Sequence, residues 1–349
     1  MATLILTGGG TAGHCIPNIA LLPYLKDKFD KIYYIGSENG IEKDLISKTN
    51  IPFYSVPCVK LSRTNAFENV KLPFKLYSGI KEAKKLIDEL NPDVVFSKGG
   101  FVSVPTVIAA SKKKIPVISH ESDLSPGLAN KFTAKYCKKV LTTFPETAKK
   151  FKNGEFVGSP IRKSLFNDKK VDVKQFGFSD TKPILLVTGG SQGAKVINNT
   201  LRSALPTILT KFNVIHICGK GNLDNKFNPK GYYQIEYTDK IENAFAVCSV
   251  CVSRAGANTL FELLSLKIPC ILIPLPKGES RGDQVDNANY FEKLGLVNVL
   301  PQENLTPESL AFAINSTYTN RNNIRKNIEK RPIFDASEKI VNILTNYIN

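Results

Sequence analysis

The chain contains the same short glycine-rich loop twice, and each copy lies between a strand-like and a helix-like segment. The copies are Gly9-Gly10-Thr11-Ala12-Gly13 and Gly189-Gly190-Ser191-Gln192-Gly193, and apolar runs at 4–6 and 184–187 precede them. A strand, a glycine turn and a helix start direct backbone N–H groups at one point, which suits a phosphate. Two copies predict two similar α/β domains. His14 follows only the first loop, which predicts different roles for the two copies.

Alternating strand and helix patterns predict an α/β fold with a doubly wound parallel sheet in each half. A chain of 349 residues is also long for a single hydrophobic core. We expect a boundary near the Gly-Ser-Pro at 158–160, and a last amphipathic helix within 335–348. The expected strands are 3–7, 31–36, 53–57, 93–97, 115–119 and 138–143, then 183–188, 212–218, 249–253 and 269–273.

Charge and cysteine usage narrow the class of protein. The net charge of +16 fits an anionic ligand or an anionic membrane surface, and no RNA-binding or helix-turn-helix pattern predicts a nucleic-acid partner. No apolar run is long enough for a spanning helix. Seven scattered cysteines and an N-terminus without a signal pattern predict a cytosolic protein. Cys248 and Cys251 lie in an apolar run, so we expect buried thiols and no metal site.

The first loop also matches the dinucleotide-binding fingerprint. Gly8-x-Gly10-x-x-Gly13 satisfies the pattern, but Glu38 lies beyond the place expected for the acidic residue that contacts the ribose. A nicotinamide enzyme has no need of a second glycine loop, so NAD binding is the less favoured alternative.

His14 is a candidate general base. It lies at the mouth of the first helix, at the carboxyl edge of the sheet, where ligands bind in such folds. An imidazole can move a proton near neutral pH, and a helix N-terminus favours its neutral form. The alternative is a histidine that only packs against the turn.

Further polar segments follow other strands. Residues 253–262 form a third glycine turn, in which Glu262 could accept hydrogen bonds from ribose hydroxyls. The alternative is a plain tight turn with Glu262 exposed to solvent on the helix. Segments 97–101, 120–123 and 274–289 offer amides and carboxylates to a sugar. No Asp-x-Asp occurs, so a departing diphosphate would depend on helix dipoles, backbone donors and Arg162 rather than on a metal.

Together these motifs resemble the N-acetylglucosaminyltransferases of glycosyltransferase family 28. The resemblance implies the GT-B fold, two Rossmann-like domains facing each other across a cleft. It implies a hexosyltransferase without cofactor or metal that takes UDP-N-acetylglucosamine and a lipid-linked N-acetylmuramyl-pentapeptide on undecaprenyl diphosphate. Residues 1–158 would bind acceptor and membrane, with helix 335–349 packing back on them, and 159–334 would bind the donor. The motifs run in the family's order at 7–14, 97–103, 120–121, 158–162, 189–193, 254–262 and 283–288.

The resemblance also implies roles for individual residues. His14 is the leading candidate base and Glu121 the second. The chain departs from the family's motifs at two places that would contact sugars. Asp283-Gln284 replaces a glutamine pair, and Ser122-Asp123 replaces Gln-Asn. The donor set is Thr11, Gly13, Arg162, Ser191, Gln192, Gly193, Ala257, Asn258, Thr259, Glu262, Asp283 and Gln284; the acceptor set is Gly9, Gly10, Ser122 and Asp123.

A lipid-linked acceptor implies a peripheral enzyme on the cytoplasmic face of the cell membrane. The segment 67–85 mixes apolar residues with lysines, and more lysines follow at 112–114 and 131–139. Such a mixture suits an anionic membrane surface, or else an amphipathic helix packed on the sheet. Two other functions stay open: a related transferase with another lipid acceptor such as diacylglycerol, and a nucleotide-binding protein without transferase activity. The segment's apolar residues are Phe67, Leu72, Phe74, Leu76, Tyr77 and Ile80, and its lysines are Lys71, Lys75, Lys81, Lys84 and Lys85.

Overall fold

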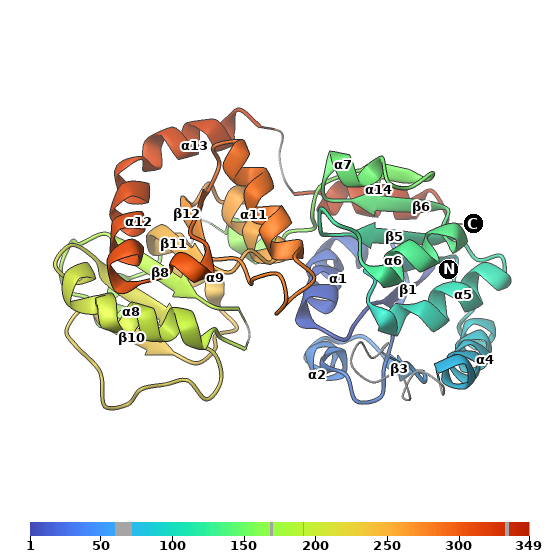
Figure 1. Ribbon diagram of the computed structural model, residues 1–349. Coiled ribbons are helices and arrows are strands. Elements are labelled where there is room, and N and C mark those ends of the chain that lie inside the picture. Colours follow the sequence, from blue (N-terminus) through green and yellow to red (C-terminus); the bar gives the residue numbers. More distant parts are fainter. Residues whose placement is uncertain (60–71, 168–169, 191, 332–334, 349) are drawn as a thin grey trace. The chain divides into compact units, whose positions relative to one another are not determined.

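The computed structural model describes residues 1–59, 72–167, 170–190, 192–331 and 335–348 (Figure 1). The chain forms two compact units. Unit 1 is Met1–Arg162 with Asp335–Asn349, and unit 2 is Lys163–Phe334. Among the described residues, no helix is both long and apolar enough to cross a membrane. Phe67 and Lys71 lie outside the described residues.

Unit 1 is built on a seven-stranded parallel sheet in the order β3-β2-β1-β4-β5-β6-β7. The chain leaves β1 toward β2 on one side, and β4 lies on the other side, so the strand order reverses between β1 and β4. Loops diverge at such a point and leave room for a ligand at the carboxyl ends. The strands are β1 (Thr3–Thr7), β2 (Lys31–Gly36), β3 (Phe53–Ser55), β4 (Val94–Ser97), β5 (Val117–Glu121), β6 (Lys139–Thr142) and β7 (Gly154–Phe156).

Helices cover both faces of this sheet (Figure 1). Because successive side chains of a strand point to opposite faces, Leu4 and Leu6 pack with α1 and α14, whereas Ile5 packs with α4 and α5. All of β1 is buried, as a central strand covered on both faces should be. The helices are α1 (Ala12–Leu25), α2 (Ile41–Ser47), α4 (Leu72–Leu90), α5 (Val104–Lys112), α6 (Leu128–Thr133), α7 (Pro145–Ala148) and α14 (Ser337–Thr345).

Unit 2 repeats the plan on a six-stranded parallel sheet in the order β10-β9-β8-β11-β12-β13. Its strand order reverses between β8 and β11. The strands are β8 (Ile184–Thr188), β9 (Asn213–Ile217), β10 (Tyr232–Ile235), β11 (Cys248–Ser253), β12 (Cys270–Leu272) and β13 (Asn298–Val299). The α-helices are α8 (Lys195–Ile208), α9 (Ile241–Val247), α10 (Ala257–Ser265), α11 (Asp283–Lys293), α12 (Pro307–Thr319) and α13 (Arg321–Glu329).

The predicted class, two doubly wound parallel sheets, is confirmed. Two boundaries differ in ways that affect the site. α1 begins at Ala12, so His14 lies inside its first turn. β5 ends at Glu121 rather than at residue 119, so His120 and Glu121 belong to the strand and are buried. The short strands β7, β10 and β13 were not expected, because two to four residues give too little alternation to recognise.

Candidate functional site

His14 lies where the β1 and β4 loops of unit 1 meet. Its Nδ1 lies 3.2 Å from the carbonyl oxygen of Lys98, the residue that follows β4. A carbonyl oxygen can only accept, so Nδ1 carries the proton and Nε2 carries the lone pair. Gly100 keeps this contact close: with φ +80° it has no side chain, and a Cβ there would lie 2.9 Å from His14 Cδ2. The arrangement gives the imidazole the tautomer that a base requires.

Glu42 occupies part of the first glycine loop. Its buried carboxylate accepts hydrogen bonds from the Gly10 N–H, at 3.0 Å, and from the Ser37 N–H, at 3.0 Å. The Gly10 amide, which the sequence offered to a phosphate, is therefore already bonded to an anion of the protein. Glu42 lies 32 residues further along the chain, on α2, and no motif pointed to it. Of the loop's other residues, Gly9 is buried, and Thr11 and Gly13 are exposed.

Lys98, whose carbonyl contacts His14, has a side chain in an unusual environment for a lysine. Its side chain is buried, with 1% of its surface exposed, and Nζ lies 2.6 Å from His120 Nδ1 and 2.7 Å from Ser122 Oγ. His120 Nε2 lies 2.8 Å from the carbonyl oxygen of Gly158. Burial lowers the pKa of Lys98 to about 7, while the charges of Glu121 and Asp123 act in the opposite direction. Burial and the charge of Lys98 hold the pKa of His120 well below its usual value, so His120 is neutral.

Glu121, the second candidate base, is enclosed by its own loop. One carboxylate oxygen accepts from the Asp123 N–H at 3.0 Å. The other accepts from the Gly127 N–H at 2.9 Å and from the Asn130 amide at 2.8 Å. These bonds fix the shape of the loop 122–127. Ser122 and Asp123, the expected acceptor residues, are half-buried on it.

The second glycine loop, at the carboxyl end of β8, packs tightly against the end of β9. Gly193 has φ +74°, and a Cβ there would collide with the Cys218 carbonyl. Asn198, one turn into α8, donates from its amide to the same carbonyl at 2.8 Å. Gln192 is exposed, and Ser191 lies outside the described residues.

Apart from Arg162, the remaining candidate residues lie on the segments that follow β11 and β12. Ala257 is the first residue of α10, and Glu262 is buried in its second turn. Gln284 Oε1 accepts from the Leu275 N–H at 3.1 Å, so it holds the loop after β12. Arg281 makes an ion pair with Asp283 at 3.6 Å. Asn258, Thr259, Asp283 and Gln284 are half-buried, as is Arg162, the last residue of unit 1 before the chain enters unit 2.

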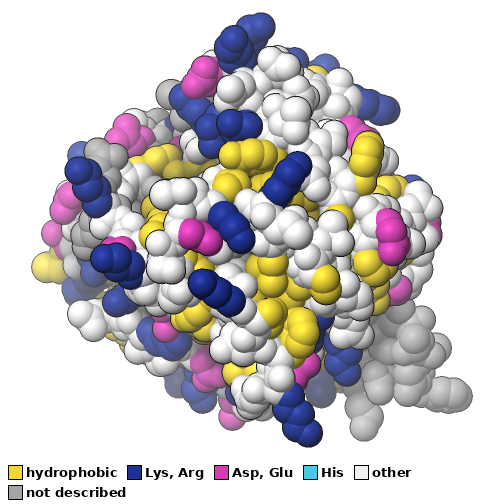
Figure 2. Space-filling view, turned by 90° about the vertical axis from the view of Figure 1, so that its left-hand side faces the viewer, with side chains coloured by type: hydrophobic (Ala, Val, Ile, Leu, Met, Phe, Trp, Pro, Cys, Tyr) yellow, Lys and Arg dark blue, Asp and Glu magenta, His cyan; other side chains and the backbone are white. Residues whose placement is uncertain are grey.

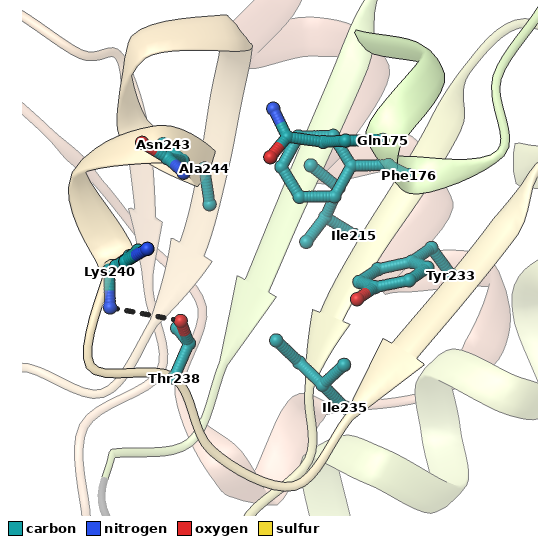
Figure 3. Close-up of a pocket in the computed structure, with 9 residues that line it drawn as sticks. All are labelled: Gln175, Phe176, Ile215, Tyr233, Ile235, Thr238, Lys240, Asn243 and Ala244. Carbon is teal, nitrogen blue, oxygen red and sulfur yellow. Dashed lines mark hydrogen bonds between the residues drawn. The ribbon is translucent and has the colours of Figure 1, made fainter. Parts of the chain in front are cut away.

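A small pocket lies in unit 2 between β9, β10 and α9 (Figure 3). The apolar side chains of Phe176, Ile215 and Tyr233 form its walls, and Thr238 and Lys240 stand at its edge. Its volume is about 180 Å³. Pockets that enclose a drug-sized ligand measure roughly 300–1,000 Å³, so we do not assign the donor to it. Among the described residues, no group of three or more His, Cys, Asp or Glu side chains is placed to hold a metal.

Comparisons with known proteins establish the family. Residues 4–142 match the glycosyltransferase family 28 N-terminal domain, and residues 184–342 match its C-terminal domain. The chain belongs to glycosyltransferase family 28. Among family 28 relatives, proteins of Clostridium botulinum strain Langeland and Clostridium perfringens strain ATCC 13124 are each 48% identical to it. The alignment covers 99% of both chains for the first, and 98% of this chain and 97% of the relative for the second.

Both relatives are named UDP-N-acetylglucosamine–N-acetylmuramyl-(pentapeptide) pyrophosphoryl-undecaprenol N-acetylglucosamine transferase. A solved structure of Acinetobacter baumannii MurG superimposes with a TM-score of 0.79 and 24% identity, covering 99% of this chain and 100% of that one. The glycotransferase of kitacinnamycin superimposes with a TM-score of 0.72 and 13% identity, covering 100% and 99%. These two structures confirm the expected GT-B fold of two Rossmann-like α/β domains.

Proposed function

We propose that this chain transfers N-acetylglucosamine from UDP-N-acetylglucosamine to the 4-hydroxyl of lipid-linked N-acetylmuramyl-pentapeptide, in peptidoglycan synthesis. The observation that carries the proposal is 48% identity, over 99% of the chain, to a relative named for this transfer. The motifs that the reaction needs lie at the carboxyl edge of each sheet, where α/β proteins bind ligands.

The reaction is a single in-line displacement that inverts the anomeric centre. The acceptor's 4-oxygen attacks C1 of the sugar and forms a new C1–O bond. The bond from C1 to the β-phosphate oxygen breaks, and its electron pair leaves with UDP. The hydroxyl proton passes to Nε2 of His14, whose Nδ1–H is held by the Lys98 carbonyl. Glu121 is the weaker candidate, because three hydrogen bonds already engage its carboxylate.

Unit 2 is proposed to bind the donor. The buried carboxylate of Glu262 would accept hydrogen bonds from the ribose hydroxyls. The loop 189–193 and the start of α8 would face the diphosphate with backbone N–H groups, aided by Arg162. Asp283 and Gln284, at the start of α11, would contact the sugar. The backbone N–H groups and Arg162 would supply positive field to the departing UDP without a metal.

Unit 1 is proposed to bind the acceptor through loop 122–127 and the first glycine loop. The Glu42 carboxylate limits where in the first glycine loop a phosphate can bind. An anion at the Gly10 amide would be repelled by the carboxylate that already accepts from it. We therefore place the acceptor diphosphate toward the exposed residues Thr11 and Gly13, at the start of α1, rather than at Gly10. In this proposal Thr11 and Gly13 move from the expected donor set to the acceptor set.

Membrane contact is proposed for α4 and α6, which both pack against α5. Phe74 and Tyr77 on α4 are 78% and 72% exposed, and Leu128 and Phe132 on α6 are exposed as well. Basic side chains also lie around apolar ones on the face drawn in Figure 2, so positive charge alone does not identify the membrane surface. Exposed aromatic side chains beside lysines are the stronger argument, because they can insert at the headgroup level.

The decisive experiment compares His14→Ala and His14→Asn with the unaltered enzyme. An asparagine amide can still donate to the Lys98 carbonyl but cannot take the proton. We expect both variants to lose about 10²- to 10⁴-fold in kcat, with UDP affinity within twofold. Turnover that persists in both variants would refute His14 as the base.

A transfer assay and a binding assay separate the alternative functions. Radiolabelled UDP-N-acetylglucosamine offered with the muramyl-pentapeptide lipid or with diacylglycerol identifies the acceptor by the labelled product. UDP and NAD are titrated separately while the melting temperature is recorded. Stabilisation by NAD alone would contradict the transferase assignment.

A further inference from the structure

Lys98 is placed where a lysine is rarely found. Fully buried lysines are uncommon unless they are paired, because removing an ammonium group from water is costly. Its Nζ lies within 2.7 Å of two polar partners, one on β5 and one on the loop that follows it. The hydrogen bonds to these two partners offset part of the free energy of burying the amine, and they fix the positions of both partners.

His120 can bind Lys98 in only one way. Its Nε2 must donate to the Gly158 carbonyl, since that oxygen can only accept. Nδ1 is therefore the acceptor for the Lys98 amine, at 2.6 Å. His120 thus anchors Lys98 and is not itself free to take a proton from a substrate.

Ser122 completes the clamp on the other side. Its hydroxyl lies 2.7 Å from Lys98 Nζ, on the loop that follows β5. The two residues therefore form one structural feature.

The backbone of Lys98 reaches the candidate base. Its carbonyl oxygen accepts from His14 Nδ1 at 3.2 Å, and its N–H donates to the Thr7 carbonyl of β1 at 2.9 Å. The side chain and the carbonyl of one residue thus join loop 122–127 to His14.

We propose that Lys98 is a positioning residue: its amine clamps His120 and Ser122, and its carbonyl holds His14 with Nε2 as the proton acceptor. The inference rests on the proposed function, in which His14 is the base. The groups facing Lys98 are His120 and Glu121 from β5, Ser122 and Asp123 from the loop after it, and His14 from α1. Its pKa near neutrality agrees with a desolvated amine enclosed by these groups.

The test is a double-mutant cycle with Lys98→Met and His14→Ala. Methionine keeps the length of the stem and removes the hydrogen bonds. We expect Lys98→Met to lower kcat by 10- to 100-fold, with KM for UDP-N-acetylglucosamine within twofold. In the His14→Ala background the same change should lower the residual kcat by less than twofold, because a residue that acts through His14 has nothing left to position. Lys28→Met, an exposed lysine beyond α1, is the control and should match the unaltered enzyme.

Each result decides the matter. A folded Lys98→Met protein with unchanged kcat, or losses that multiply with His14→Ala, would overturn the inference. If Lys98→Met does not fold, Ser122→Ala replaces it in the cycle. We expect Ser122→Ala to lower kcat three- to tenfold, and we expect this loss to vanish in the His14→Ala background. An unchanged kcat in Ser122→Ala would also overturn the inference. If His14→Ala itself stays active, the base assignment fails; if His14→Ala is inactive and Lys98→Met is active, only the Lys98 inference fails.

Discussion

Burying Lys98 makes the stability of unit 1 depend on pH. Its pKa is about 7 in the folded chain and 10.5 ordinarily, so between these values the unfolded chain binds the proton and the folded chain does not. Stability therefore rises with pH across this window, by up to about 1.4 kcal/mol per pH unit. From pH 7 to pH 9 the unaltered protein should gain about 2–3 kcal/mol relative to Lys98→Met. Urea unfolding at the two pH values measures this difference, and parallel pH curves for the two proteins would contradict it.

Gly100 controls the distance between the β4 loop and His14. In Gly100→Ala the new Cβ would meet the Gly9 carbonyl and His14 Cδ2, in addition to the strain of φ +80°. Gly177→Ala is a matched control, because Gly177 has φ +75° and nothing within 4 Å of a Cβ. We expect both to lose about 1 kcal/mol of stability from backbone strain, and Gly100→Ala alone to lose at least tenfold in kcat. Equal kcat in the two variants would show that His14 does not depend on this spacing.

At the scale of single elements, sequence patterns located the regular strands well. β1 and β2 begin and end where the apolar runs predicted, because a central parallel strand is apolar on both faces. The clamp around Lys98 was not predicted, because it depends on residues 22 and 24 positions away. The role of Glu42 was not predicted for the same reason. Periodicity places a residue on a helix or strand, but it does not show which loop its side chain contacts.

Helix α4 gives the membrane proposal a direct test. Phe74→Ser with Tyr77→Ser removes two aromatic side chains that are largely exposed, so the free energy of unfolding should change by less than about 0.5 kcal/mol per site. Binding to vesicles containing anionic lipid should fall at least tenfold in a sedimentation assay. Phe312→Ser is the control: Phe312 is 75% exposed but belongs to α12 of unit 2. Similar losses for both proteins would remove α4 from the membrane surface.

At the scale of the whole molecule, the chain returns to unit 1 after completing unit 2. Asp335 binds the Ile161 N–H, and the Ala336 N–H donates to the Ser159 carbonyl, so the two crossings between units are tied together within unit 1. Beyond them, α14 places Ile340 and Leu344 in the core formed by β1 and α1. The first glycine loop and His14 therefore lie in a unit that is complete only when the last residues of the chain are present.

This connectivity predicts that changes in α14 act on unit 1 and spare unit 2. Leu344→Ala removes a fully buried side chain and should destabilise unit 1 by about 2–5 kcal/mol, whereas Asn342→Ala, exposed on the same helix, should cost less than about 0.5 kcal/mol. In a calorimetric scan, saturating UDP should raise only the transition of unit 2, the proposed donor unit, because binding stabilises the unit that holds the ligand. Leu344→Ala should lower only the other transition. If both changes shifted one common transition, the units would unfold together, and α14 would stabilise the whole chain rather than unit 1 alone.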